Sequence, residues 1–491
     1  MGTISSAFSI MAQALDADQA GLNVVANNVA NANTPGYTEE TPTWNENQPI
    51  EINGMSVGTG VTETGATSQR DSVLEERLNQ QQQLASASGS RLAALNTVQA
   101  LFTPASGSSS STAGDIGSDL TSFFNSFSSL EAQPTDNSKR ESVLSTASTL
   151  ASDVSNAAAS LNQQSAALDQ QAAGVADQVN ALTSNLAQLN QQIQSSSPDA
   201  DAGTLEDQRQ EDLAQLSQLI GINQTSTGNN GLAVTTTSGQ LLVSDGSNFQ
   251  LTTGSVDGVT HFYIGTSDVT AQLASGGGSL GGDLTARDQD IPTVMASLDQ
   301  LAYSVSTQVN SLNNAGTDAN GATGAAVASS TSGAMTLDIF SRPPTQAANQ
   351  ASGGNDVSGS AASMSVVMTD PNQISAAALG KGTGDNSNAV AMANLASQSV
   401  VNGQSPSDFY SNFVSTLGST VSDVQTENTA QTASVTQLQT QNDSISAVNL
   451  NDEASAMTTL ERSYQAASQV FTMLNTLMAS ALNLGDQTAV S

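Results

Sequence analysis

Apolar residues recur at heptad spacing at both ends of this 491-residue chain, and that pattern limits the fold more than any other feature of the sequence. Between residues 3 and 31 they are separated by alternating steps of four and three, with Asp18 as one acidic interruption. A stripe with this spacing packs along one partner helix in a coiled coil. We call its apolar members the N-terminal seam: Ile4, Phe8, Met11, Leu15, Leu22, Val25 and Val29.

Residues 450–484 carry the same kind of stripe at the other end of the chain. Asp452 and Glu453 stand in the first turn of the expected helix, where negative charge interacts favourably with the helix dipole. The sequence therefore predicts two long terminal helices, and we expect the two ends of the chain to lie together. The large members of this C-terminal seam are Met457, Leu460, Tyr464, Phe471, Leu474 and Met478.

A third heptad repeat runs through the first half of the chain and predicts a helix over about 141–195. Leu161, Leu168, Leu182 and Leu189 are among its members, and its outer faces carry Gln, Asn and Ala rather than charges. Weaker amphipathic patterns predict further helices over 70–101, 204–220, 289–314 and 406–447.

Between these helices the sequence pattern is typical of β-strands. In 221–285, runs of β-branched residues alternate with Asn-Asn-Gly, Ser-Gly and Asp-Gly, which is a hairpin pattern. A second such stretch, 322–385, contains Met364–Met368 and much Gly and Ser. Two Gly- and Ser-rich runs, 106–111 and 276–278, are typical of flexible linkers.

These patterns predict a multidomain α+β protein: a long coiled-coil rod built from N- and C-terminal segments, with a β-rich insertion projecting from mid-chain. We expect three units. They are a terminal coiled-coil domain (1–40 plus 449–491), a helical rod domain (41–220 plus 286–321 plus 386–448) and a β-rich outer insertion domain (221–285 plus 322–385).

The charge balance excludes several functions. The chain has 10 basic and 44 acidic residues, a net charge of −34, and its only lysines are Lys139 and Lys381. Nucleic acids and anionic membrane surfaces attract clustered Lys and Arg, so neither is an expected partner. The absence of Cys removes disulfides and zinc–thiolate sites. The N-terminus lacks the basic and apolar regions of a Sec signal peptide, which leaves a cytosolic protein or one exported unfolded without a cleaved signal.

No cluster of residues predicts catalysis, a cofactor or a metal. The one histidine, His261, falls in an expected strand without a recognisable nucleophile, and we interpret it as an ordinary half-buried or surface side chain. The segment Asp318–Gly321 superficially resembles part of a calcium loop. Aligned on Gly321, however, its last ligand position would be Val327, so a turn is the better interpretation.

A ten-residue string closes the N-terminal helix: Asn28-Val29-Ala30-Asn31-Ala32-Asn33-Thr34-Pro35-Gly36-Tyr37. Pro35 and Gly36 suit the central positions of a type II turn. The string resembles the signature of flagellar rod, hook and hook-associated axial proteins, and within that group the chain is most similar to those that join the hook to the filament. That family usually carries Arg-Gln where this chain has Glu39-Glu40. Supporting stretches lie at 281–288, 316–321, 370–374, 384–389 and 448–466.

The resemblance implies export in an unfolded state through the flagellar type III apparatus and assembly outside the cell. It implies a ring of subunits between hook and filament, with terminal helices lining the central channel. The implied partners are other copies of the chain, the hook protein, a neighbouring hook-associated protein on the filament side, and a cytoplasmic export chaperone that covers the C-terminal seam. The implied assembly residues are both seams together with Asn28, Asn31, Pro35, Gly36 and Tyr37.

Other interpretations compete with this one. The chain resembles a hook protein less closely, because a hook protein should be mostly β between its terminal helices. A secreted coiled-coil adhesin or type III translocator would not need the Asn28–Tyr37 string. An enzyme hidden in the insertion is a third alternative, for which the residues offer no active site.

Overall fold

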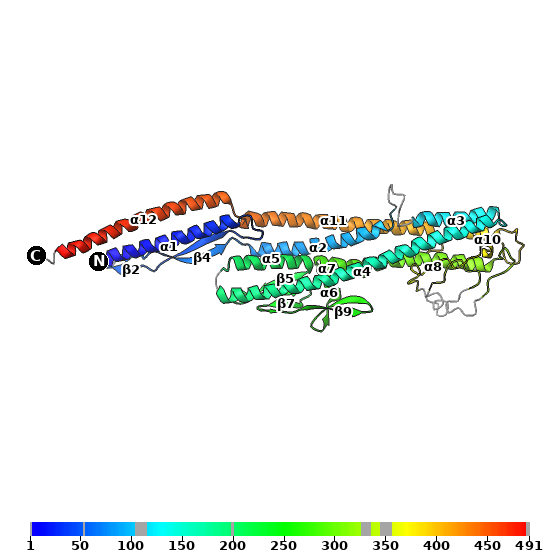
Figure 1. The fold of residues 1–491 in the computed structure, drawn as a ribbon, viewed down its shortest axis with the longest axis horizontal. Coiled ribbons are helices and arrows are strands. Elements are labelled where there is room, and N and C mark those ends of the chain that lie inside the picture. The colour runs from blue at the N-terminus through cyan, green and yellow to red at the C-terminus, as the bar shows by residue number, and fades with distance from the viewer. Residues whose placement is uncertain are drawn as a thin grey trace.

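The protein is an elongated rod with both ends of the chain at the same end of the molecule (Figure 1). The computed structural model describes residues 2–52, 55–103, 115–197, 201–325, 335–343 and 356–487. Helix α1 (Gly2–Asn31) and helix α12 (Leu450–Gln487) lie side by side at that end, as the two seams predict. In the described part of the chain, no helix combines the length and hydropathy needed to cross a membrane.

A β-hairpin that the sequence analysis did not predict lies along α1. Its stem pairs β1 (Glu40–Glu46) with β4 (Val61–Ser68), and near its tip β2 (Ile50–Ile52) pairs with β3 (Met55–Val57). Trp44 of the hairpin and Leu460 of α12 both approach Gly21 of α1, where an added Cβ would lie 3.3 and 3.1 Å from them. Glycine at this position lets three elements meet.

The rod is built from long helices that agree with the predicted ones. They are α2 (Ser72–Ala100), α4 (Asn137–Ser196), α5 (Thr204–Leu219), α8 (Ile291–Ala315) and α11 (Pro406–Ser446). The side chain of Asp71 caps α2 by accepting from two backbone N–H groups, and Asp136 and Ser405 cap α4 and α11 by accepting from one each. Helix α4 is 60 residues long and contains the whole predicted heptad repeat.

A short helix missed by the sequence analysis, α3 (Ile116–Ala132), supplies much of the rod's apolar core. Phe123 and Phe127 of α3 are fully buried, and the Phe123 ring packs edge-on against Phe340 with centroids 5.5 Å apart. Helices α2, α4, α8, α10 (Ser387–Asn394) and α11 contribute most of the remaining apolar side chains of this core, and non-helical segments add others, such as Ile339 and Phe340.

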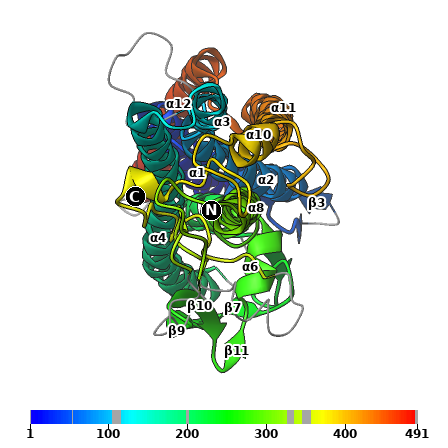
Figure 2. The same ribbon diagram turned by 90° about the vertical axis from the view of Figure 1, so that its right-hand side faces the viewer.

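Residues 222–268 form the expected antiparallel strands, which pack on the second half of α4 and project to one side of the helices (Figure 2), whereas residues 270–285 form two short helices instead of strands. One sheet has four strands, β5 (Ile222–Ser226), β6 (Leu232–Thr236), β7 (Leu241–Ser244) and β8 (Ser247–Asn248). The other has three strands, β9 (Leu251–Val256), β10 (Val259–Ile264) and β11 (Ser267–Asp268).

The expected linker at 276–278 is wrong. This run joins α6 (Thr270–Gly276) to α7 (Gly278–Thr285), and Gly278 is buried. A Cβ on Gly221 would lie 1.8 Å from the carbonyl oxygen of Gly276, and one on Gly282 would lie 2.2 Å from that of Ala87 in α2. These glycines therefore permit close packing rather than flexibility. The chain passes from α7 into α8 through a π-turn at Ala286–Asp290.

The described residues of 322–385 also differ from the expected hairpins. They form isolated bridges and one 3-10 turn, Pro371–Gln373, instead of strands. The side chain of Asn310 in α8 replaces a strand partner: its Oδ1 accepts from the N–H groups of Ile339 and Phe340, and its Nδ2 donates to the Phe340 carbonyl. The segment thus packs against the rod. The division into three domains stays a prediction.

Candidate functional site

The two seams face each other along α1 and α12. The rings of Phe8 and Phe471 are in contact, with centroids 4.2 Å apart, and Val25 is buried. The seam residues Met11, Leu15, Leu22, Met457, Leu460 and Leu474 are half-buried. Three members stay exposed in the single chain: Val29 (40%), Tyr464 (38%) and Met478 (38%). Ile4 lies in α1, outside the residues whose side chains are described.

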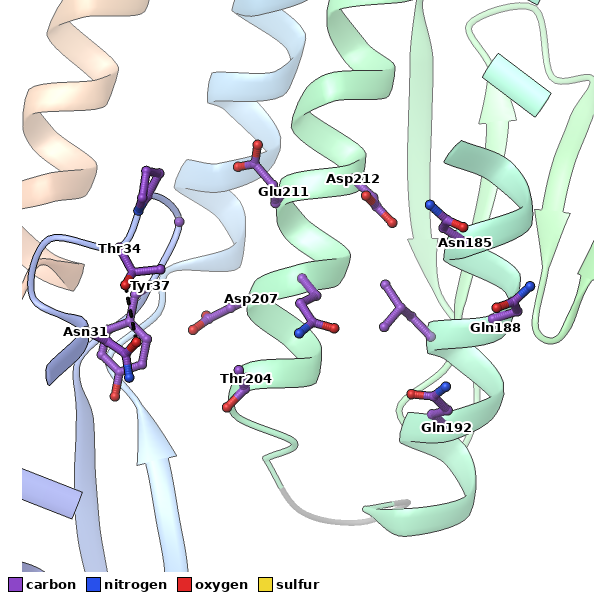
Figure 3. Close-up of a pocket in the computed structure, with 14 residues that line it drawn as sticks. Asn31, Thr34, Tyr37, Asn185, Gln188, Gln192, Thr204, Asp207, Glu211 and Asp212 are labelled. Atoms are coloured by element: carbon purple, nitrogen blue, oxygen red, sulfur yellow. Dashed lines mark hydrogen bonds between the residues drawn. The ribbon is translucent and has the colours of Figure 1, made fainter. Parts of the chain in front are cut away.

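The signature string forms the predicted turn. The Tyr37 N–H donates to the Thr34 carbonyl at 3.2 Å and Gly36 has a φ of +78°, which a type II turn requires at its third position. Asn31 ends α1 locally: its amide nitrogen donates to Asn27, and its Oδ1 accepts from the Thr34 hydroxyl at 3.2 Å (Figure 3).

The side chain of Asn28 in α1 hydrogen-bonds to four polar groups, which belong to the signature turn, β1 and α12. Its Nδ2 donates to the Glu40 carbonyl and to Glu453 Oε1 of α12, each at 2.8 Å. Its Oδ1 accepts from the Tyr37 hydroxyl at 2.8 Å and from the Glu40 N–H at 3.0 Å. The side chain is only 1% exposed, so all the hydrogen-bonding capacity of this buried amide is used inside the protein.

Below Asn28, the terminal helices meet the rod at a narrow region that we call the neck: residues 32–39, 69–71 and 447–449. The chain leaves toward the rod through 69–71 and returns through 447–449. Glu39 ties both connections together. Its N–H donates to the Ser446 carbonyl, and its carbonyl accepts from the Gln69 N–H, both at 2.8 Å.

The rod side of the neck is acidic. Asp207 of α5 accepts from the Thr38 N–H at 3.2 Å and also binds the Arg70 guanidinium, which contacts Glu206 at 3.4 Å and Glu75 at 3.7 Å. Burial raises the pKa of Asp207 and raises that of Glu75 to about 7 despite the nearby Arg70 charge. Burial also raises the pKa values of the carboxyl groups of Glu40 and Glu453 and of the Tyr37 hydroxyl.

An open cavity of about 510 Å³ lies between the signature turn, α4 and α5. Asp207 and Glu211 point from α5 toward the turn, whereas Asp212 points toward Asn185 and Gln188 of α4 (Figure 3). Most of the side chains that line the cavity are Asn, Gln, Thr, Asp or Glu, which can form hydrogen bonds. Across the residues that the structure describes, no group of three or more His, Cys, Asp or Glu side chains could hold a metal ion.

The two other segments considered from the sequence have ordinary structural roles. His261 Nδ1 lies 2.7 Å from Asp268 Oδ2 on the outer strands, with 30% of its side chain exposed. Asp318 is buried, and its Oδ1 accepts from the N–H groups of Asn320 and Ala322, as in a side-chain-stabilised turn. The interpretation of this segment as a turn is confirmed.

Sequence reasoning missed the polar contacts that Glu453, Asp207 and Arg70 make at or beside the neck. Glu453 was noted only as an acidic residue in a first helical turn, and nothing in the local sequence connects it to Asn28. Its partner could be inferred only from the expectation that the chain ends lie together.

Comparisons with known proteins agree with the architecture. The family model "Flagellar hook-associated protein FlgK helical domain" matches residues 105–327, and the model "Flagella basal body rod protein" matches residues 10–38. Flagellar hook-associated protein 1 of Escherichia coli (strain K12) is 25% identical, with 98% of this chain and 100% of the relative covered. The protein of that name from Bacillus subtilis (strain 168) is 26% identical, with 96% of each chain covered.

A solved structure has the same fold. The flagellar hook junction protein FlgK from Burkholderia pseudomallei superposes with a TM-score of 0.63 at 19% identity, covering 75% of this chain and all of that one. Together, these comparisons show that the chain is similar over almost its whole length to proteins named flagellar hook-associated protein 1, and that its N-terminal string lies within the match to the rod-protein model.

Proposed function

We propose that this protein is a structural subunit of the bacterial flagellum and forms the junction between hook and filament. The observation that carries the proposal is the full-length similarity to proteins named flagellar hook-associated protein 1, which includes both chain ends. The paired terminal helices and the rod of long helices suit a part that transmits load and forms no catalytic centre.

The terminal helix pair supports assembly into a ring. Each seam is only partly covered by the other in the single chain, and α12 carries a second apolar stripe beside its seam. Met473 and Leu477 on that stripe are 57% and 58% exposed. Exposed apolar surface of this kind is typical of protein interfaces. We infer that neighbouring copies cover it and that the helix pair lines the channel of the assembled ring.

The further partners follow from a position between hook and filament. We propose that one end of the ring contacts the hook protein and the other a hook-associated protein on the filament side. Before assembly, the chain travels unfolded through the flagellar type III apparatus without a cleaved signal peptide. Before export, a cytoplasmic chaperone has to cover the C-terminal seam, because an exposed apolar helix face promotes aggregation. Such a helix can bind in an apolar groove of the chaperone.

Deleting the gene tests the proposal. The mutant is expected to build hooks of normal length, to lack filaments, and to release flagellin into the medium. Expression of the full chain should restore filaments. Normal filaments in the mutant would contradict any junction role, and loss of the hooks themselves would point to a different axial protein.

A further inference from the structure

Apolar packing stiffens the rod but does not extend through the neck. The two apolar cores of the described chain draw their residues from the rod helices, the strands and the segments packed on them, and include none from α1, α12 or the hairpin. The direction of the helix pair relative to the rod therefore depends on polar contacts.

Two layers of polar contacts cross this region. In the upper layer, Asn28 binds the end of α1 to the start of β1 through both backbone groups of Glu40, and to the first turn of α12 through Glu453. Glu453 is itself 5% exposed, and its N–H donates to the Asn449 carbonyl of the returning connection at 3.0 Å. Asn28 therefore holds the helix ends at a fixed distance from the neck.

In the lower layer, Glu39 joins the outgoing and returning connections through its main chain, while Thr38 and Ser68 reach the rod. Thr38 N–H donates to Asp207, and Ser68 donates to Asp201 through its N–H at 2.6 Å and its hydroxyl at 3.0 Å. Because Glu39 and Glu40 act mainly through backbone atoms, the Glu-Glu pair can replace the usual Arg-Gln of the family without removing these bonds.

We propose that Asn28 is the positioning residue of the neck, and that its four hydrogen bonds fix the direction in which the terminal helix pair leaves the rod. The inference rests on the proposed function for its consequence: the neck sets the orientation in which each subunit offers its seams to neighbouring copies. The geometry itself is independent of that function. Loss of the Asn28 amide would leave the buried carboxylate of Glu453 without this donor, which costs more than the bond alone.

The absence of Cys makes the neck accessible to distance measurement. We would introduce cysteines at Ala433 of α11 and Ser463 of α12, both exposed, and attach spin labels. At 1.5 Å per residue the two sites lie roughly 40 Å apart across the neck, within the range of double electron–electron resonance. We expect one narrow distribution of distances between the two labels when the neck carries no further substitution.

Four variants separate positioning from general stability. Asn28→Ala and Asn28→Asp are expected to widen the distribution at least twofold. Asn31→Ala is the matched control, because Asn31 belongs to the same string but bonds only to Asn27 and Thr34 in the described structure. The double variant Asn28→Asp with Glu453→Gln reverses the polarity of one bond and keeps the total charge, so it should restore much of the narrow distribution.

Hydrogen–deuterium exchange gives a second readout. The amides of residues 38–41 should exchange at least tenfold faster in Asn28→Ala, because the Glu40 N–H loses its acceptor, while exchange in α4 stays unchanged. If Asn28→Ala does not fold, Asn28→Asp is compared with the double variant Asn28→Asp with Glu453→Gln. A narrower distance distribution in the double variant supports the positioning role, and equal widths contradict it.

Two outcomes would overturn the inference: a wide distribution in the original chain, or equal distributions for Asn28→Ala and Asn31→Ala. These measurements use the isolated protein. A failed deletion test would therefore remove the junction role and leave the positioning result standing.

Discussion

Phe8 and Phe471 stack with ring centroids 4.2 Å apart and planes tilted by 38°, although they lie near opposite ends of the chain. Tilted aromatic contacts of this kind contribute about 0.5–1.5 kcal/mol beyond the burial of their surface. The pair is the clearest link between the two seams. Removing either end of the chain would expose the partner on the remaining helix, so both ends are needed for one structural unit.

The first prediction concerns the double use of the C-terminal seam. Phe471→Asp or Leu474→Asp places a charge in the contact with α1 and, on our proposal, in the groove of the export chaperone. Each variant should lose several kcal/mol of interaction. We expect reduced secretion and absent filaments even on overproduction, whereas Ser468→Asp, at an exposed position, should behave as the original protein.

A chaperone pull-down with the original protein and Leu474→Asp separates the two uses. Weaker capture of the variant is expected. Equal capture would limit the seam to packing within the assembled ring.

The second prediction concerns two glycines in helices. Gly282→Ala would bring a Cβ within 2.2 Å of the Ala87 carbonyl oxygen, so α7 and α2 must separate; we expect a loss of about 1–3 kcal/mol. Gly174→Ala is the matched variant in α4, where nothing lies within 4 Å of the added Cβ. It should gain about 0.5–1 kcal/mol from the better helix propensity of Ala. Thermal melting measures both, and a stabilising Gly282→Ala would contradict the close packing.

The third prediction concerns pH. Burial, together with a hydrogen bond to the carboxyl of Asp153, raises the pKa of Asp119 from 3.8 to about 7. Between these values the folded state binds more protons than the unfolded state, so stability should fall as pH rises from about 4 to 7. Asp119→Asn should therefore melt higher than the original protein at pH 8, with the difference shrinking toward pH 4. Glu141→Gln, at an exposed position of α4, serves as the control and should show no such trend.

The fourth prediction concerns metals. No adequate group of ligands exists among the residues that the structure describes, and the sequence predicts none. EDTA should leave the melting temperature unchanged. A shift of several degrees would show that a cation holds part of the protein together.

Local patterns predicted the long helices and the turn at Pro35-Gly36, because heptad spacing and turn chemistry act over a few residues. Contacts between distant segments were not readable in the same way. The run 276–278 has the composition of a linker, but Gly278 is buried and Gly276 packs closely against Gly221. The local sequence does not show this contact. The hairpin expected around Met364–Met368 is reduced to a single bridge between Val366 and Phe340. The N–H groups of Ile339 and Phe340 donate to Asn310 of α8, a contact between distant segments that the local sequence does not show.

In the candidate site, too, local sequence features were predictable and contacts between distant residues were not. The sequence identified Asn28 and Tyr37 through the string that contains them, but not the contact between Asn28 and Glu453, which joins residues 425 positions apart. Helix α3 was missed although Leu120, Phe123 and Phe127 recur at helical spacing.

Electron cryomicroscopy of isolated hook–filament junctions would show the position and orientation of the subunits. We expect one ring of this protein between hook and filament, with α1 and α12 of every subunit facing the channel and the strands β5–β11 facing outward. A junction that contains a different protein at this level, or a ring in which the terminal helices face the solvent, would contradict this expectation.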